Sequence, residues 1–189
     1  MEQFQNTAYN SVQFNEAVFD TLEMLDKQTL NHSLRVRNIA NSISDNFGYV
    51  DGLLPKAAIV HDIGKIYISS KILNKPDKLT DLERNIVNLH SYYGYRLLKD
   101  LNVSDVICYI VLYHHGLNIP ALEDIPRCED KKIVEYANVL HTIDSYEALI
   151  SERVFRKRYT SEEALNILYT EKEHQKDILK FLENSRMYV

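Results

Sequence analysis

The sequence is poor in the residues that form tight turns and in the residues that crosslink small folds. Its 189 residues contain five glycines, four prolines, two cysteines and no tryptophan. So little glycine disfavours a sheet-and-turn fold and a glycine-rich loop that cradles phosphate. Cys108 and Cys128 lack the close spacing of a metal motif, so we expect free thiols in a reducing compartment. The length suits one domain with a substantial core.

Long apolar runs and an excess of positive charge are also missing. No stretch approaches the roughly 20 apolar residues of a membrane-spanning helix, and the polar N-terminus lacks the pattern of a signal peptide. The formal net charge of −5 gives no electrostatic reason to expect binding to duplex nucleic acid. We therefore expect a cytoplasmic protein that binds neither a membrane nor duplex nucleic acid.

Apolar residues recur at helical spacing through most of the chain, and start and stop signals divide the pattern into segments. Gly48 is expected to end the second segment, and Thr80 with Glu83 forms a capping-box pattern at the start of the fourth. Phe47 and Leu82 are expected on inward faces, and residues 66–80 in a loop. The predicted helices span about 12–25, 28–47, 51–65, 80–99, 104–115 and 131–152, followed by one from 161 and one over 175–186.

Several ionisable side chains fall on helix faces that otherwise look like core. Burying such groups without partners costs several kcal/mol, so they are paired or bind metal. One inward histidine is more often a satisfied core residue than a ligand, but five of them with two aspartates favour a metal site. The candidate ligands are His32, His61, Asp62, His90, His114, His115 and Asp144.

The donor set predicts the kind of metal centre. Imidazole and carboxylate without thiolate disfavour structural zinc and suit iron or manganese, with zinc, nickel or magnesium as alternatives. These ligands exceed the needs of one ion, and two divalent ions that share Asp62 are the economical solution. Such a pair can lower the pKa of a bridging water and hold phosphate oxygens. Lys65 is expected to neutralise phosphate or orient that water, with a solvated helix end as the alternative.

The spacing of these motifs resembles the HD-GYP branch of the HD-domain metal phosphohydrolases over about residues 30–165. The matching segments are HDIGK at 61–65, KPDKLTDLE at 75–83, His90, HH at 114–115, and Asp144 ahead of EALISERVFR. The resemblance implies an all-α, single-domain helical bundle of about seven to eight helices. Residues 1–25 would be an N-terminal helical extension, 26–165 the phosphohydrolase domain, and 166–189 a C-terminal helix that closes the same domain.

The resemblance also implies roles for individual residues. One ion would be held by His32, His61, Asp62 and Asp144, and the other by Asp62, His90, His114 and His115. Lys65 would face the scissile phosphate and take part in catalysis with Asp62. Arg153 and Arg156 match basic positions that meet the nucleotide in this family, with a solvated helix end as their alternative.

The sequence departs from the family pattern at several positions. The Gly-Tyr-Pro loop after the HH pair is replaced by GLNIPALEDIP, which weakens the implied specificity for cyclic diguanylate. Gln28 stands where members with three metals carry a glutamate, so we expect two ions. Glu147 replaces a second aspartate. His141 is expected to be a packed core residue, or else a partner of Asp144, and His174 a surface residue.

These observations predict a metal-dependent phosphodiesterase that hydrolyses a cyclic dinucleotide, with cyclic diguanylate as the leading candidate. One alternative is hydrolysis of another nucleotide. Another is a non-catalytic module that binds a nucleotide or a signalling partner through the altered loop at 116–130. The intact ligand set favours an enzyme, because a chain released from catalysis has little physical reason to keep costly inward polar groups. A homodimer or a signalling partner stays open.

Overall fold

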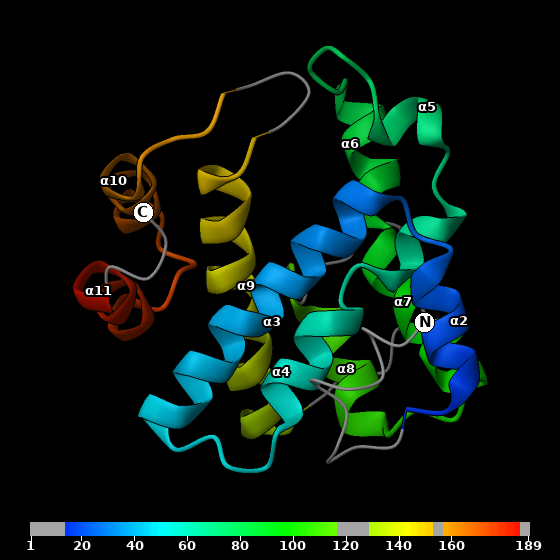
Figure 1. The fold of residues 1–189 in the computed structure, drawn as a ribbon, viewed down its shortest axis with the longest axis horizontal. Helices are drawn as coiled ribbons and strands as arrows, with labels where there is room; N and C mark the ends of the chain where they lie inside the picture. Colours follow the sequence, from blue (N-terminus) through cyan, green and yellow to red (C-terminus); the bar gives the residue numbers. More distant parts are fainter. Residues whose placement is uncertain (1–13, 117–128, 153–156, 186–189) are drawn as a thin grey trace.

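The computed structural model describes residues 14–116, 129–152 and 157–185, and these ranges contain helices and connecting segments without strands (Figure 1). The all-α prediction is therefore confirmed. The elements are α2 (Glu16–Glu23), α3 (Lys27–Phe47), α4 (Leu53–Val60), the 3-10 helix η1 (Ile63–Tyr67), α5 (Ser70–Leu73), α6 (Asp81–Asn88), α7 (His90–Asp100), α8 (Asp105–Tyr113), α9 (Lys131–Ile150), α10 (Ser161–Thr170) and α11 (Lys176–Ser185).

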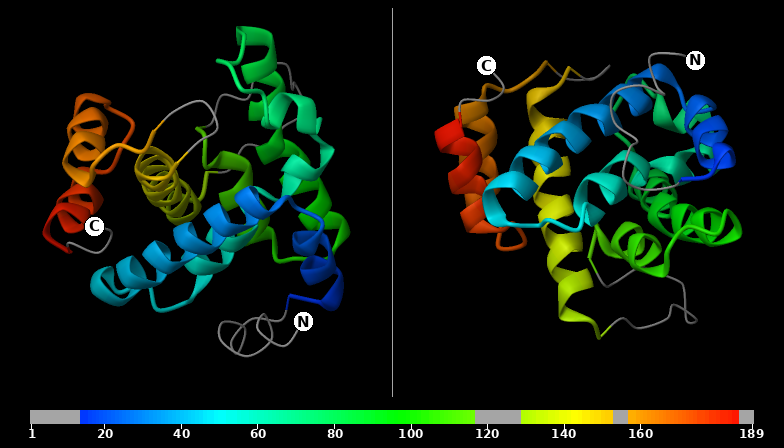
Figure 2. Two further views of the ribbon diagram at one scale, coloured as in Figure 1. Left: turned by 45° about the horizontal axis from the view of Figure 1, so that its top comes forward. Right: turned by 60° about the horizontal axis from the view of Figure 1, so that its bottom comes forward.

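The two longest helices, α3 and α9, organise the bundle. Helix α3 packs along α4 and also contacts α9, while α8 joins α7 on one side to α4 and α9 on the other. Helices α10 and α11 pack on α9 at one side of the molecule, and α2, α5 and α6 lie toward the opposite side (Figures 1 and 2). The ligand-bearing parts of the chain thus meet in the interior, between these two outer groups.

The core is formed by apolar residues that recur at helical spacing on α3 and α9. On α3, Val36, Ile39 and Ile43 are completely buried, and Leu140 and Ile143 are completely buried on α9. Each such side chain contributes about 1.5–3 kcal/mol by leaving water, which fixes the faces that α3 and α9 turn inward. The polar residues on those faces are carried inward with them.

The predicted helix boundaries hold where a capping signal is present in the sequence. Gly48 ends α3 with φ +75°, a conformation that glycine adopts without steric cost. Thr80 and Glu83 form the capping box at the start of α6. Asp26 starts α3, because its carboxylate accepts hydrogen bonds from the N–H groups of Gln28 and Thr29 at 3.0 Å.

Several sequence-based expectations are wrong. The helix predicted over 80–99 is two helices, α6 and α7, which meet at Leu89, and the one predicted over 51–65 ends at Val60 before η1. Helix α5 lies within the predicted loop. Leu82 and Phe47 are exposed rather than inward, with 71% and 39% of their surface accessible. His174 is buried, not on the surface, because it lies between α10 and α11 beside α9.

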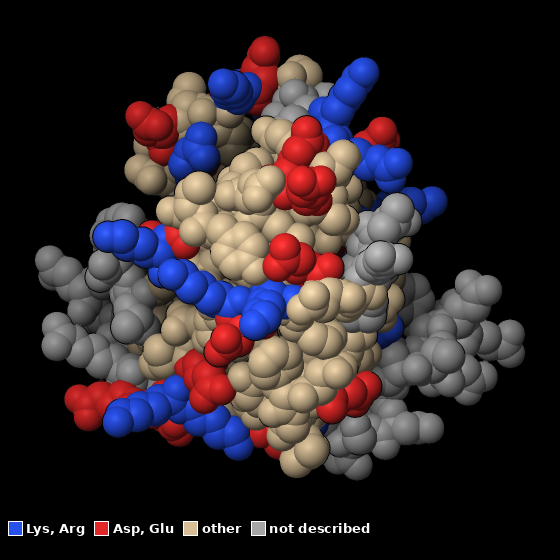
Figure 3. All heavy atoms as spheres, turned by 90° about the vertical axis from the view of Figure 1, so that its left-hand side faces the viewer, with Lys and Arg blue, Asp and Glu red and all other residues tan. Residues whose placement is uncertain are grey.

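The described part of the chain carries charges of both signs on its surface, as the composition indicates (Figure 3). On the face seen in Figure 3, basic and acidic side chains are mixed, with other residues between them. Among the described residues, no helix combines the length and apolarity needed to cross a bilayer. The predicted free thiol at Cys108 is present and buried, and Cys128 lies outside the described residues.

Candidate metal centre

The seven predicted ligands come from five separate parts of the chain and converge on one place. His32 and Asp144 lie on α3 and α9, His61 and Asp62 follow α4, His90 begins α7, and the HH pair ends α8. Their donor atoms form three overlapping groups, each with all atoms within 4.8 Å of one another. The groups are His90, His114 and His115; His32, His61 and Asp62; and His61, His114 and Asp144.

Three of the histidines are oriented by a backbone carbonyl group three residues earlier. Nδ1 of His61 lies 2.8 Å from the carbonyl oxygen of Ala58, and Nδ1 of His90 and of His114 each lies 2.6 Å from the corresponding oxygen. A carbonyl can only accept, so Nδ1 carries the proton and Nε2 keeps its lone pair. All three residues sit at a helix end, where such carbonyls lack partners within the helix.

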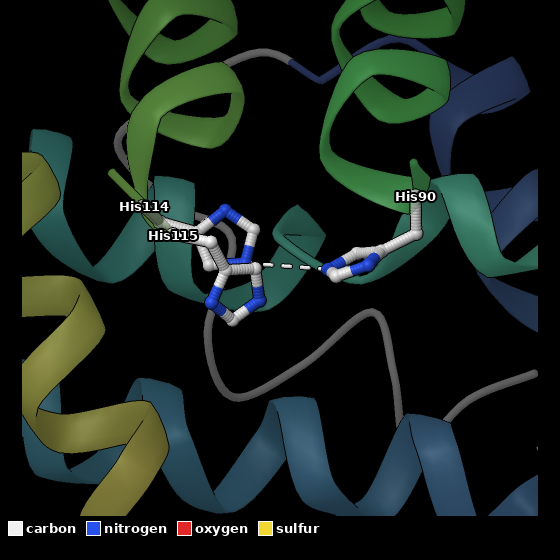
Figure 4. Close-up of side chains that lie close together, drawn as sticks. All are labelled: His90, His114 and His115. Carbon is white, nitrogen blue, oxygen red and sulfur yellow. Dashed lines mark hydrogen bonds between the residues drawn. The ribbon is translucent and has the colours of Figure 1, made fainter. Parts of the chain in front are cut away.

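The Nε2 atoms then face one another inside the site. His90 Nε2 lies 3.4 Å from His114 Nε2, with His115 beside them (Figure 4). His61 Nε2 is buried and has no hydrogen-bond partner among the described residues. Burial lowers the pKa of His90 to about 3 despite the nearby Asp62, so the ring is neutral. Lone pairs aimed at one another need a cation between them, so these residues fit a metal ion.

Asp62 connects the two parts of the cluster. Its Oδ2 lies 3.6 Å from His61 Nε2 and 3.8 Å from His32 Nε2, whereas its Oδ1 lies 3.3 Å from His90 Nε2. Burial favours the neutral acid, but Lys65 and the surrounding imidazoles outweigh it and hold the pKa of Asp62 well below its usual value. An ionised carboxylate with one oxygen toward each group has the geometry expected of a bridging ligand.

His32 differs from the other histidines because it is held between carboxylates. Its Nε2 lies 2.8 Å from Asp144 Oδ1, and its Nδ1 pairs with Glu147 Oε2. Burial opposes a charge on the ring, but hydrogen bonds to Asp144 and Glu147 raise the pKa of His32 to about 9. His32 would hold a metal ion through Nε2 only after giving up that proton, so metal binding there would release a proton.

Sequence reasoning missed the role of Glu147 and its partner Arg35. Glu147 is 1% exposed; its other oxygen, Oε1, accepts from Arg35 Nε and from the hydroxyl of Ser151. The carboxylate therefore orients His32 from the side opposite the cluster, and Arg35 compensates its charge. The available signal was spacing, because Arg35 and Glu147 each lie one helical turn beyond a predicted ligand.

Gly64 allows the HDIGK segment to reach α7. A Cβ atom at this position would lie 2.1 Å from the carbonyl oxygen of His90 and 2.4 Å from the backbone nitrogen of Gly94. Real Cβ atoms essentially never come so close, so only glycine fits without a shift of backbone. The close packing of η1 on α7 is what brings Asp62 near His90.

The remaining predicted residues have different positions. Lys65 lies beside the cluster with Nζ 2.6 Å from Asp62 Oδ2, and it lines a cavity. His141 is half-buried, contacts the ring of His115 edge-on at 5.8 Å, and stacks on His174 at 4.8 Å. Arg153 and Arg156, predicted to bind substrate, lie outside the described residues.

Comparison with known proteins identifies the family. The model of the HD domain family matches residues 29–149, so this chain belongs to the HD domain family. This confirms the family resemblance drawn from the His-Asp doublet. The match includes all seven predicted metal ligands and excludes α2, α10 and α11.

The curated relatives are named as phosphodiesterases of cyclic dinucleotides. A cyclic di-GMP phosphodiesterase of Pseudomonas aeruginosa is 31% identical over 152 residues, which cover 76% of this chain and 36% of that protein. A cyclic di-GMP phosphodiesterase of Thermotoga maritima is 29% identical, with 80% and 44% covered. A 3'3'-cGAMP-specific phosphodiesterase of Vibrio cholerae is 29% identical, with 74% and 31% covered. The chain spans less than half the length of these relatives.

A solved structure shares the fold. The HD domain of the Listeria monocytogenes phosphodiesterase PgpH, in complex with cyclic-di-AMP, aligns with a TM-score of 0.65 and 21% sequence identity. The alignment covers 89% of this chain and 92% of that one. The predicted HD-type helical bundle is thereby confirmed.

Proposed function

We propose that this chain is a metal-dependent phosphodiesterase that hydrolyses a cyclic dinucleotide, and that cyclic diguanylate is the first substrate to test. The observation that carries the proposal is the placement of Asp62, whose two oxygens face two groups of imidazole nitrogens. A bridged pair of ions is a common arrangement for phosphodiester hydrolysis. The names of the relatives support the substrate class.

The residues of the candidate site have two roles: seven would bind metal, and Lys65 would contact the substrate. Two divalent ions, iron or manganese by donor type, would supply Lewis-acid stabilisation of the phosphate and lower the pKa of the attacking water. We assign the seven clustered residues as ligands, with Asp62 shared. Lys65, held by Asp62 and facing the cavity, would place its ammonium against a phosphate oxygen and stabilise the negative charge that develops there.

The cavity beside the ligands has the kind of lining that a nucleobase needs. It has a volume of 140 Å³ and an apolar wall formed by Leu73, Leu79 and Val87, with the amide of Asn74 among them. An apolar wall with a few polar groups is what a nucleobase needs for stacking and hydrogen bonding. Arg153 and Arg156 remain proposed nucleotide contacts, and they follow Glu152, which lines the same cavity.

We propose that the chain acts in the cytoplasm, alone, as a homodimer or with a signalling partner, and that residues 26–165 form the catalytic domain. Hydrolysis of a different nucleotide is the second candidate activity, since the Gly-Tyr-Pro loop is absent and the sequence there is GLNIPALEDIP.

The test combines metal analysis with a substrate panel. Protein purified anaerobically is expected to hold close to two ions per chain and, with iron or manganese supplied, to hydrolyse cyclic dinucleotides faster than mononucleotide esters. Full metal loading without turnover of any nucleotide would reject the enzyme in favour of a binding module. Three well-occupied ions in an anomalous-scattering map would reject the proposed ion count.

Replacement of Lys65 separates catalysis from metal binding. Lys65→Ala should lower turnover about 100-fold, since one preorganised cation at developing charge is worth a few kcal/mol, while the ion content stays at the parent level. The readouts are initial rates and elemental analysis of the same sample. Lys71→Ala, an exposed lysine on α5, is the matched control and should behave like the parent.

A further inference from the structure

The cavity beside the metal centre continues into a second one, and together they form one groove. The first, of 140 Å³, reaches His32, Asp62 and Lys65. The second, of 630 Å³, extends away from the centre to Asn31 and Arg158. The residues that line both are Gln28, Arg35, Glu147, Ser151 and Glu152. A ligand that starts at the metal centre can therefore extend along this groove.

Arg35 lies at the junction of the two cavities as a fixed cation. Its Nε is bound to the buried Glu147, and 44% of its side chain remains exposed. A guanidinium carries five N–H donors, so the pairing through Nε leaves the four N–H groups of the terminal nitrogens. Because Glu147 holds the planar group in place, less conformational entropy is lost when an anion binds.

Arg158 provides a second cation at the far end of the groove. It is exposed and forms no ion pair with any described carboxylate. The backbone beside it is anchored, because the N–H of Tyr159 donates to the carbonyl oxygen of Leu149 at 3.0 Å.

The groove therefore has basic side chains at three places. Lys65, paired with Asp62, lies near the metal ligands, and Arg35, paired with Glu147, lies at the junction. Arg158, which has no ion pair among the described residues, lies at the far end.

The carboxylates in the same groove have other roles, with one exception. Asp26 caps α3 and accepts hydrogen bonds from Gln28 and Thr29. Glu147 is neutralised by His32 and Arg35. Glu152 is exposed and lines both cavities. It is the exception, because it has no partner among the described residues and its negative charge opposes the binding of an anion.

We propose that Arg35 and Arg158 form a subsite for the second phosphate of a cyclic dinucleotide whose first phosphate lies at Asp62 and Lys65. This inference rests on the proposed function and extends it, because it explains why a substrate with two phosphates would be preferred over one with a single phosphate. The competing explanation is that Arg35 only neutralises Glu147 and that Arg158 is a solvated cation. The two explanations predict different effects of Arg158.

The test measures binding rather than turnover. The probe is the bis-phosphorothioate analogue of cyclic diguanylate, which resists hydrolysis, and its dissociation constant is measured by equilibrium dialysis on manganese-loaded protein. Arg158→Ala is expected to raise that constant about tenfold, as for the loss of charge-assisted hydrogen bonds, and to raise the constant for guanosine monophosphate much less. Arg35→Lys keeps the charge but loses the planar fork, so an intermediate increase is expected.

Two further variants complete the design. Glu152→Gln removes an opposing charge and should tighten binding of the cyclic analogue by about two- to threefold at low salt. Arg96→Ala removes an exposed arginine on α7 outside the groove and is the matched control, expected to bind like the parent.

The outcomes distinguish the inference from the proposed function. Unchanged binding by Arg158→Ala, or equal losses for the cyclic analogue and the mononucleotide, would overturn the subsite and leave the proposed activity standing. Failure of the parent to bind the cyclic analogue would also overturn it. If binding depends on Arg158 but cyclic diguanylate is not hydrolysed, the subsite stands and the proposed activity fails.

Discussion

Backbone carbonyl groups at helix ends determine how most of the histidines in this centre are used. His61, His90 and His114 each donate from Nδ1 to a carbonyl three residues earlier, so Nε2 points away from its own helix. In the middle of a helix that carbonyl would be occupied by a backbone N–H. The position of each helix end therefore also determines the direction in which the ligand nitrogen points.

Variants of Glu147 test whether its carboxylate positions His32 for metal binding. Glu147→Gln keeps the shape of the side chain but removes the charge that supports His32, so metal affinity should fall about 10- to 100-fold. Glu147→Asp restores a carboxylate and should lose less. Affinity is measured by competition with a chromogenic chelator. Glu135→Gln, a change on the same helix where the carboxylate pairs with Tyr49 instead, should match the parent; an equal loss there would refute a specific role for Glu147.

Six of the ligand candidates could be predicted from sequence because each is a polar residue at an apolar position, whereas His115, which is exposed, was predicted from the HH doublet. The structure brings all seven together. For Arg35 the only signal in the sequence was its spacing from His32, because an arginine on a helix is ordinarily solvated. Its contact with Glu147 on α9 is seen in the structure. His174 was misassigned for a related reason. Its neighbours in sequence are charged, whereas its burial results from contact with His141, far away along the chain.

Helix boundaries were predictable where the cause is local. The capping box at Thr80 and the left-handed Gly48 are determined by nearby residues. The break at Leu89 is not, because the apolar pattern runs through it without glycine or proline. At this break His90 Nδ1 donates to the carbonyl oxygen of Val87, a contact that orients a candidate metal ligand and that the helix pattern does not indicate. Elements therefore depart from the sequence pattern mainly beside the candidate site.

Replacement of Gly64 tests whether the close contact between η1 and α7 is needed for the candidate site. Gly64→Ala places a methyl group against the backbone of α7, so η1 must shift; we expect unfolding to become easier by about 1–3 kcal/mol and metal content to fall. Urea unfolding and elemental analysis measure both effects. Gly48→Asn is the control, since a Cβ there meets nothing within 4 Å and asparagine tolerates positive φ. Similar losses in both variants would mean that contact with α7 is not the cause.

At the scale of the whole molecule, the candidate centre joins parts of the bundle that are distant in sequence. The His32–Asp144 contact alone spans 112 residues and links α3 to α9. The candidate ligands come from α3, α7, α9 and the segments that follow α4 and α8. The unfolded chain does not hold these segments together, so it would bind an ion much more weakly than the folded chain does. Metal binding should therefore stabilise the entire fold rather than one loop.

The last prediction follows from that linkage. With free metal at about 100 times its dissociation constant, each bound ion adds roughly 2.7 kcal/mol, so removing one ion with a chelator should lower Tm by roughly 5–10 °C and removing both ions by about twice that amount. The close approach of the lone pairs of His61, His90 and His114 without a cation is one physical reason why the chelated protein is expected to be the less stable form. Differential scanning calorimetry of loaded and chelated protein measures the difference.

A ligand variant provides the internal control for this experiment. His114→Ala removes one donor shared by two of the three groups, so the difference in Tm between loaded and chelated protein should shrink. Arg96→Ala changes an exposed side chain that is not among the ligand candidates and should keep the full difference. If the loaded parent protein holds its ions but has the same Tm as the chelated protein, the bound ions do not connect these helices. The seven residues would then not be the ligands that hold the fold together.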